Sequence, residues 1–173
     1  VLVFAGNIRE KDALTLAKTY FSPIGGKRNR NFLPFKKFGN DRVYLRTKST
    51  EQSHIVLGVP GVSALDPDYF TQKLLAIILG GNMSSRMFLN IREARGLCYY
   101  IATDTDNYLD AGSLSTSAGV DTSRLEEAIK AIKHEYMECA KKGVTDDELL
   151  RAKEYLKGKI TLSLEDSEDR AHF

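Results

Sequence analysis

The stretch LGGNMSSRMFLNIREARGLCY, residues 79–99, decides the fold because the backbone changes its structure several times within it. Gly80 and Gly81 end an apolar helical pattern and allow the following loop to pass close to another surface. Residues 83–95 carry apolar side chains at the spacing of one helix face, and Gly96 is the expected C-terminal stop. The residues after this glycine have the composition of a strand. The stretch therefore predicts a helix, a glycine loop, a short helix and a strand, in that order.

Upstream of this stretch the chain divides into a short first part, a linker and the start of a larger unit. The pattern of residues 1–21 predicts a strand, a turn and a helix, and residues 22–41 have the composition of a linker. Residues 42–48 alternate polar and apolar side chains, which predicts an edge or half-exposed strand. Residues 54–59 are apolar nearly throughout and predict a central strand buried on both faces. Asp66-Pro67-Asp68 is a typical helix start, and that helix is expected to run to the two glycines.

Downstream, the chain predicts a hairpin followed by two amphipathic helices. Residues 97–106 and 111–120 are the hairpin strands, and Asp121 caps the first helix. Thr145 and Glu148 form a capping box that begins a helix running to the end of the sequence. The core stripe expected on the first helix is Leu125, Ala128, Ile129, Ile132, Tyr136 and Ala140. The element order predicts an α+β fold in which helices pack on a mostly antiparallel or mixed sheet.

Composition excludes several classes of protein. The 25 basic and 23 acidic residues give a net charge of +2, too balanced for binding to nucleic acid, and the basic stretch at residues 25–48 is better explained as a solvated linker than as a nucleic-acid arm. The longest apolar run has six residues, so no membrane association is expected. Cys98 and Cys139 lack metal-ligand spacing. We expect both to be reduced thiols in a cytoplasmic protein.

None of the common catalytic motifs occurs in the chain. Zinc on a helix needs two histidines one turn apart, and no such pair exists among His54, His134 and His172. We expect His134 to be solvated on a helix face and His54 to be a satisfied core or edge residue. Nucleophile elbows, phosphate loops and dinucleotide fingerprints are also absent from the sequence.

Residues 79–99, with several shorter segments, resemble the C-terminal half of zinc peptidases of the pitrilysin/insulinase family, which carry the inverted H-x-x-E-H motif. The resemblance is greatest to the bacterial two-domain members related to the β subunit of the mitochondrial processing peptidase. It extends over nearly the whole chain. The shorter segments that carry it are residues 1–7, 50–55, 65–69, 143–145, 151–153 and 163–166.

The resemblance implies a role for two residues of this chain. In the family, an arginine and a tyrosine seven residues apart in the C-terminal half are directed at the substrate, and Arg92 and Tyr99 have that spacing and context. Zinc and the general base belong to the N-terminal half, whose motif this chain lacks. The intact protein is then a zinc metalloendopeptidase that cleaves peptides, and this fragment should be inactive alone. Arg86 and Glu93 are assigned to the helix surface or to contacts between domains.

The same resemblance sets expectations for domains and partners. Residues 1–21 would be the end of the N-terminal catalytic domain, residues 22–41 a linker, and residues 42–173 a processing-peptidase-like C-terminal domain truncated at its end. The implied partners are a peptide substrate, the missing catalytic domain and a second copy in a homodimer. Two alternatives stay open: a non-catalytic chamber-forming subunit of a peptidase-like complex, and a stand-alone interaction domain.

Three residues depart from the family pattern. Asn82 stands where relatives commonly carry a third glycine, Cys98 where alanine is usual, and Tyr100 where a smaller polar residue is common. We expect Cys98 to be an inert packing residue, because nothing nearby in the sequence lowers its pKa. None of the departures removes Arg92 or Tyr99.

Overall fold

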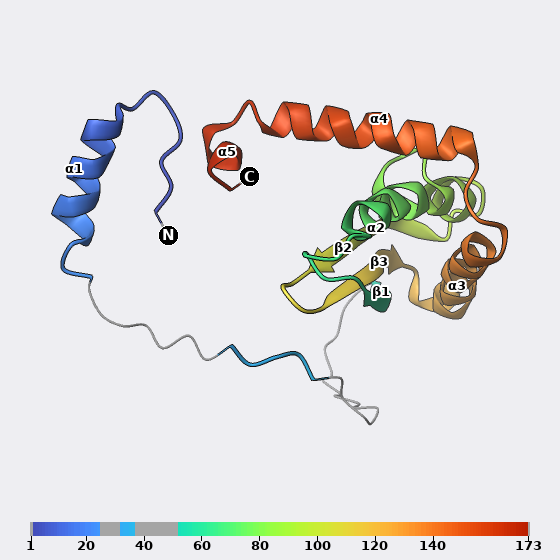
Figure 1. The fold of residues 1–173 in the computed structure, drawn as a ribbon. Helices are drawn as coiled ribbons and strands as arrows, with labels where there is room; N and C mark the ends of the chain where they lie inside the picture. The colour runs from blue at the N-terminus through green and yellow to red at the C-terminus, as the bar shows by residue number, and fades with distance from the viewer. Residues whose placement is uncertain (1, 25–31, 37–51, 173) are drawn as a thin grey trace. The chain divides into compact units, whose positions relative to one another are not determined.

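The computed structural model describes residues 2–24, 32–36 and 52–172 (Figure 1). The chain divides into two compact units, of which the larger is Pro34–Glu154 and the smaller combines Val1–Leu33 with Tyr155–Phe173. The predicted strand at residues 42–48 and most of the predicted linker lie outside the described residues.

The larger unit contains an antiparallel sheet of three described strands, β1 (Ser53–Gly61), β2 (Cys98–Asn107) and β3 (Gly112–Val120). The strand order is β1-β3-β2, so β3 lies in the middle. β2 and β3 form the predicted hairpin, and β1 pairs antiparallel with the other edge of β3. The helices and this sheet confirm the predicted α+β class.

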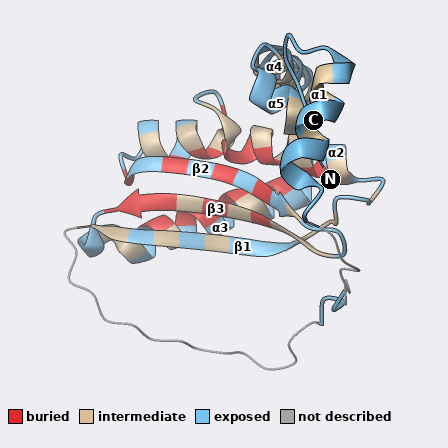
Figure 2. Cartoon of the chain, turned by 90° about the vertical axis from the view of Figure 1, so that its left-hand side faces the viewer, coloured by how far each residue is buried: buried red, intermediate tan, exposed pale blue. Residues whose placement is uncertain are grey.

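The prediction that residues 54–59 form a central strand buried on both faces is wrong. Among the described strands β1 lies at an edge, and its residues are alternately half-buried and exposed over most of its length. Ile55 and Leu57 pack on the core, whereas Val56 is 69% exposed. An unbroken apolar run does not distinguish the middle of a sheet from an edge strand with one open face, and here the hairpin strand β3 takes the middle place (Figure 2).

The helix after β1 begins later than predicted and ends where predicted. Asp66 accepts a hydrogen bond from the backbone N–H of Asp68 (2.8 Å) in a turn, and α2 (Tyr69–Ala76) starts after this turn. α2 continues as the π-helical turn η1 (Ile77–Gly81) up to the two glycines. The next helix has a π-helical part, η2 (Phe88–Glu93).

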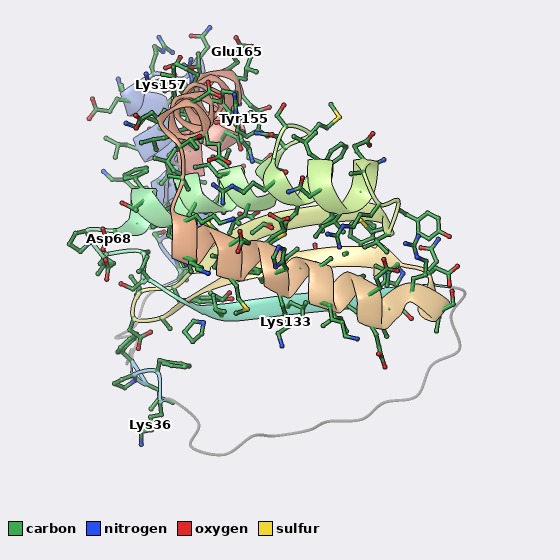
Figure 3. The ribbon with its side chains drawn as sticks, turned by 90° about the vertical axis from the view of Figure 1, so that its right-hand side faces the viewer. Lys36, Asp68, Lys133, Tyr155, Lys157 and Glu165 are labelled. Carbon is green, nitrogen blue, oxygen red and sulfur yellow. The ribbon has the colours of Figure 1, made fainter. Side chains whose placement is uncertain are left out.

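The long helix after the hairpin begins as predicted. Asp121 accepts a hydrogen bond from the backbone N–H of Ser123 (2.8 Å) at the start of the short η3 (Thr122–Arg124), which leads into α3 (Leu125–Lys142). The expected core position Ala140 is instead exposed, because the buried stripe runs through Ala131, Glu135 and Cys139. Exposed side chains of α3 such as Lys133 project from its other side (Figure 3).

The core lies between the helices and one face of the sheet. Alternate strand residues such as Ile101, Leu114 and Ala118 face the helices, and we call the face of the sheet that carries them the covered face (Figure 2). The largest fully buried side chains of the core are Leu79, Met87, Ile91, Leu97, Ile132, Val120 and Thr116.

The intervening residues of the same strands form the opposite face, which we call the open face. The register places them in four rows across β1, β3 and β2. The rows are His54, Gly119 and Tyr100; Val56, Ser117 and Ala102; Gly58, Ser115 and Asp104; and Pro60, Ser113 and Asp106.

The smaller unit contains α1 (Glu10–Phe21), the second half of α4 (Asp146–Ser163) and α5 (Ser167–His172). α1 confirms the predicted helix, but the predicted strand before it does not form, because residues 2–5 have no strand beside them among the described residues. α4 ends at Ser163 rather than continuing to the end of the sequence. In the described ranges, no helix combines the length and the apolarity that a membrane span requires.

Candidate functional site

Arg92 and Tyr99, the two predicted site residues, flank one tight turn of the larger unit. Arg92 lies at the end of η2, and Tyr99 is the second residue of β2. Gly96 closes the helix with a positive φ of 56°, donating its N–H to the carbonyl of Arg92 (3.0 Å), while Leu97 donates to Ile91 (3.0 Å). The bond from Gly96 to Arg92, with a left-handed glycine just past the helix, is an αL helix end, which explains the glycine.

The Arg92 side chain is half-buried and lies over an aromatic ring. Its guanidinium carbon is 4.6 Å from the centroid of the Phe88 ring, one helical turn earlier. Such a cation–π contact restricts the side chain without using its N–H donors. Within the described part of the chain, Arg92 makes no ion pair, so its donors are available to a ligand.

Tyr99 sits on a β-bulge. Cys98 pairs with Val120 and Tyr100 with Gly119, so two residues of β2 advance the chain by one residue of β3. The bulge interrupts the in-and-out alternation, and both tyrosines are exposed, Tyr99 by 59%. No hydrogen bond joins the Tyr99 hydroxyl to any other described residue.

Cys98, which lies between Arg92 and Tyr99 in the sequence, is a packing residue. It is buried, and burial raises the pKa of its thiol, although the nearby positive charge of Arg92 acts in the opposite direction. A protonated buried thiol is a poor nucleophile. The predicted inert role therefore agrees with its surroundings, and Arg92 and Tyr99 are the groups of this turn that a ligand could reach.

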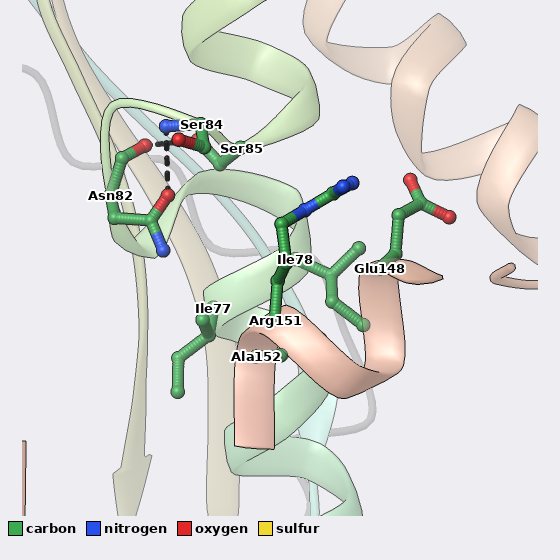
Figure 4. Close-up of a pocket in the computed structure, with 8 residues that line it drawn as sticks. All are labelled: Ile77, Ile78, Asn82, Ser84, Ser85, Glu148, Arg151 and Ala152. Atoms are coloured by element: carbon green, nitrogen blue, oxygen red, sulfur yellow. Dashed lines mark hydrogen bonds between the residues drawn. The ribbon is translucent and has the colours of Figure 1, made fainter. Parts of the chain in front are cut away.

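The glycine loop packs tightly against β2, as its composition predicts. A Cβ at Gly80 would lie 2.7 Å from the backbone nitrogen of Thr103, closer than packing allows. Asn82, in place of the usual third glycine, accepts a hydrogen bond from the backbone N–H of Ser84 (2.8 Å) (Figure 4). The pocket beside this loop has about 30 Å³ of interior space, room for one or two waters rather than a peptide.

Arg86 is not a free residue of the helix surface, one of its two predicted assignments, but forms an ion pair within the larger unit, and the other assignment, a contact between domains, stays a prediction. Its Nε donates to Oε1 of Glu148 (2.6 Å), and its Nη2 donates to Oε2 (2.7 Å) and to the carbonyl of Gly143 (2.9 Å). Both side chains are less than 20% exposed. The hydrogen bond from Arg86 lowers the pKa of Glu148 to about 2, and hydrogen bonds from Thr145 add to the effect.

This ion pair explains how the helix that carries Arg92 is held. Arg86 lies one and a half turns before Arg92 on the same helix, and Glu148 also completes the predicted capping box by accepting from the Thr145 backbone N–H (2.8 Å). The sequence predicted the capping box of Thr145 and Glu148 but not the ion pair of Glu148 with Arg86, since residues 86 and 148 are far apart along the chain.

The sequence also missed a polar pair on the open face. His54 Nδ1 lies 3.1 Å from the Tyr100 hydroxyl, and their rings stack with centroids 6.0 Å apart. His54 is thus the satisfied edge residue of the two predicted alternatives rather than a core residue, since β1 lies at an edge among the described strands, while His134 is exposed as expected. The sequence signal that could have indicated this pair is Gly119, the glycine of β3 that lies opposite both residues.

Zinc does not fit the residues of this chain that are described. Across residues 2–24, 32–36 and 52–172, no three His, Cys, Asp or Glu side chains gather where they could hold a metal ion. The donor pair Arg92 and Tyr99 is suited to binding a carbonyl or an anion rather than a cation.

Comparison with known sequences identifies the family of the chain. Residues 1–156 match a family described as "Peptidase M16 inactive domain". The chain belongs to this family. The match confirms the family predicted from residues 79–99, and it agrees with a chain that carries the non-catalytic half of a peptidase.

A relative of this M16 inactive domain in Streptomyces coelicolor bears the name "uncharacterized zinc protease". It is 32% identical over 174 residues, which cover 96% of this chain and 38% of the relative. The M16 inactive domain described here therefore spans about two fifths of that relative's length.

Solved structures share the fold. An M16 inactive domain from Pseudomonas fluorescens matches with a TM-score of 0.61 at 29% identity, covering 65% of this chain and 27% of that chain. A protease from Helicobacter pylori reaches a TM-score of 0.78 over 95% of this chain and 41% of that chain. Its 18% identity shows a common fold alone.

Proposed function

We propose that this M16 inactive domain is the substrate-orienting half of a zinc-dependent metalloendopeptidase, and that it is inactive alone. The observation that carries the proposal is the turn at Gly96. It brings an arginine and a tyrosine, neither engaged by another charged or hydrogen-bonding side chain among the described residues, to one end of the sheet.

The chemistry of peptide hydrolysis explains why these two donors suit the role. Attack of water on an amide carbonyl moves negative charge onto its oxygen. A phenol O–H and a guanidinium held near that oxygen stabilise the charge, and they do so without reorganisation if the protein already holds them in place. Tyr99 and Arg92 are the donors in this proposal, with Phe88 and the bulge restricting their directions.

The proposal assigns zinc and the general base to an N-terminal catalytic domain outside this chain. Its substrate is an unfolded peptide held extended by strand addition to a sheet edge, and the intact protein forms a homodimer. The two free cysteines, both buried, support a reducing compartment such as the cytoplasm. The boundaries at residues 21 and 41 remain part of the same proposal.

Turnover of a quenched fluorescent peptide by the full-length parent protein, with and without a chelator, tests the proposal. We expect cleavage that the chelator abolishes and about one zinc per chain. A folded parent that binds no metal and cleaves no peptide would contradict it. That result would favour the alternative, a non-catalytic subunit that only helps to build the chamber of a peptidase-like complex.

A further inference from the structure

The row His54, Gly119 and Tyr100 lies across the three strands at the end of the sheet where Tyr99 bulges out. Both His54 and Tyr100 pair with Gly119 in the register, from opposite sides of β3. The row therefore joins β1 to Tyr100, the residue that follows the bulged Tyr99.

Gly119 is required for this arrangement. A Cβ at this position would lie 2.5 Å from Cε1 and 2.9 Å from Cδ1 of the Tyr100 ring. The ring thus occupies the space that any side chain at residue 119 would need. It follows that the orientation of Tyr100 is set by the absence of a side chain opposite it.

The phenol of Tyr100 then reaches across the glycine to β1. Its oxygen is 3.1 Å from His54 Nδ1, with the two ring planes 28° apart. Tyr100 remains 42% exposed and His54 is also exposed, so burial does not hold the pair in place. The hydrogen bond between His54 and Tyr100 and the stacking of their rings over Gly119 hold the pair in place.

The residues before and after the bulged Tyr99 are both fixed in place. Cys98, before Tyr99, is buried in the core, and Tyr100, after it, is held on Gly119 by His54. Bulges beside active sites serve to aim a side chain. A one-residue slip or a flattening of this bulge would turn the phenol of Tyr99 away.

We propose that His54 and Tyr100 are positioning residues that act through Tyr99, by locking the bulge that aims its hydroxyl. The inference rests on the proposed function for the role of Tyr99, but its structural content, the lock on the bulge, can be measured separately.

Kinetics of the full-length parent test the positioning role. His54→Ala and Tyr100→Phe remove the hydrogen bond from either side, and we expect kcat to fall roughly tenfold or more with KM within about twofold and metal content unchanged. His54→Asn, whose amide can reach the place of Nδ1, should recover most of the rate. The matched control is Val56→Ala, on the same strand and face, which should keep wild-type kcat.

A double-mutant cycle separates a positioning role from an independent one. If His54 acts through Tyr99, the double variant His54→Ala with Tyr99→Phe should be no slower than Tyr99→Phe alone. Effects that multiply, or an unchanged kcat in both His54→Ala and Tyr100→Phe, would overturn the proposal.

A spectroscopic readout keeps the test independent of peptidase activity. In the parent labelled with 3-fluorotyrosine, the ¹⁹F resonance that disappears in Tyr99→Phe belongs to Tyr99. We expect this resonance to shift or broaden in His54→Ala and to stay in place in Val56→Ala. An unmoved resonance in His54→Ala would overturn the lock, whether or not the parent cleaves peptides, whereas a moved resonance in an inactive parent would support the lock and reject only the proposed function.

Discussion

The two faces of the same three strands place their polar side chains in different surroundings, buried on one face and exposed on the other. On the covered face, Thr103 and Thr116 hydrogen-bond to each other (2.7 Å), and Thr116 also bonds to the Tyr136 hydroxyl of α3 (2.8 Å). On the open face, the hydroxyl of Tyr100 lies beside an exposed histidine, and at the bulge next to it the hydroxyl of Tyr99 has no partner among the described residues. Satisfied polar groups stabilise packing, whereas available donors can bind something else.

The largest effect that separates the two faces is on stability. Ile132 is fully buried on α3 above the covered face, so Ile132→Ala should lower the free energy of unfolding by about 3 kcal/mol through lost burial and a cavity. Val56→Ala, on the open face, should change it by less than about 0.5 kcal/mol. Urea unfolding of the chain measures both, and similar losses would mean that the open face is packed after all.

The next effect is on catalysis. Tyr99→Phe removes one donor and should lower peptide turnover by the parent roughly 100-fold, while the free energy of unfolding changes by less than about 0.5 kcal/mol. Arg92→Ala should behave in the same direction, with metal content unchanged. Wild-type turnover in either variant would show that the residue has only a structural role.

The Arg86 and Glu148 pair gives a smaller effect that depends on pH. Arg86→Met should cost about 2 kcal/mol at neutral pH, because it leaves a largely buried carboxylate without its positively charged partner. The folded-state pKa of Glu148, about 2, lies below its ordinary value of 4.5. The pair's contribution is therefore complete above about pH 4.5 and is lost as pH falls toward about 2.

Unfolding of both proteins across that range measures this contribution. We expect the difference in stability between wild type and Arg86→Met to shrink as the pH falls below 4.5. A difference that stays constant down to pH 2 would assign the stabilisation to packing of the arginine stem instead.

The smallest effect concerns the buried hydroxyls of the covered face. Thr103→Val removes a hydroxyl that shares a hydrogen bond with the Thr116 hydroxyl, and we expect a loss of about 1 kcal/mol with no change in peptide turnover. Thermal unfolding measures the loss of stability, and the peptide assay measures turnover. A loss of turnover would show that the covered face also shapes the site.

Local patterns in the sequence predicted the parts of the fold that depend on neighbouring residues. The hairpin, the Gly96 helix stop, the Asp121 cap and the Thr145 capping box all form as expected. Each is defined by hydrogen bonds or dihedral angles within a few residues, so a single sequence contains the whole signal. The failures are different: the place of β1 at an edge among the described strands and the ion pair of Arg86 both depend on partners distant in the sequence.

The sequence by itself determined the family and the order of elements from α2 through the hairpin to α3, since these patterns are local, and its resemblance to the family named Arg92 and Tyr99 as candidate residues. Only the tertiary structure decided that Tyr99 lies on a bulge, that Tyr100 rests on Gly119, and that His54 completes the row. Strand register brings these residues together across three strands, and register is set by the packing of the whole sheet rather than by any one segment.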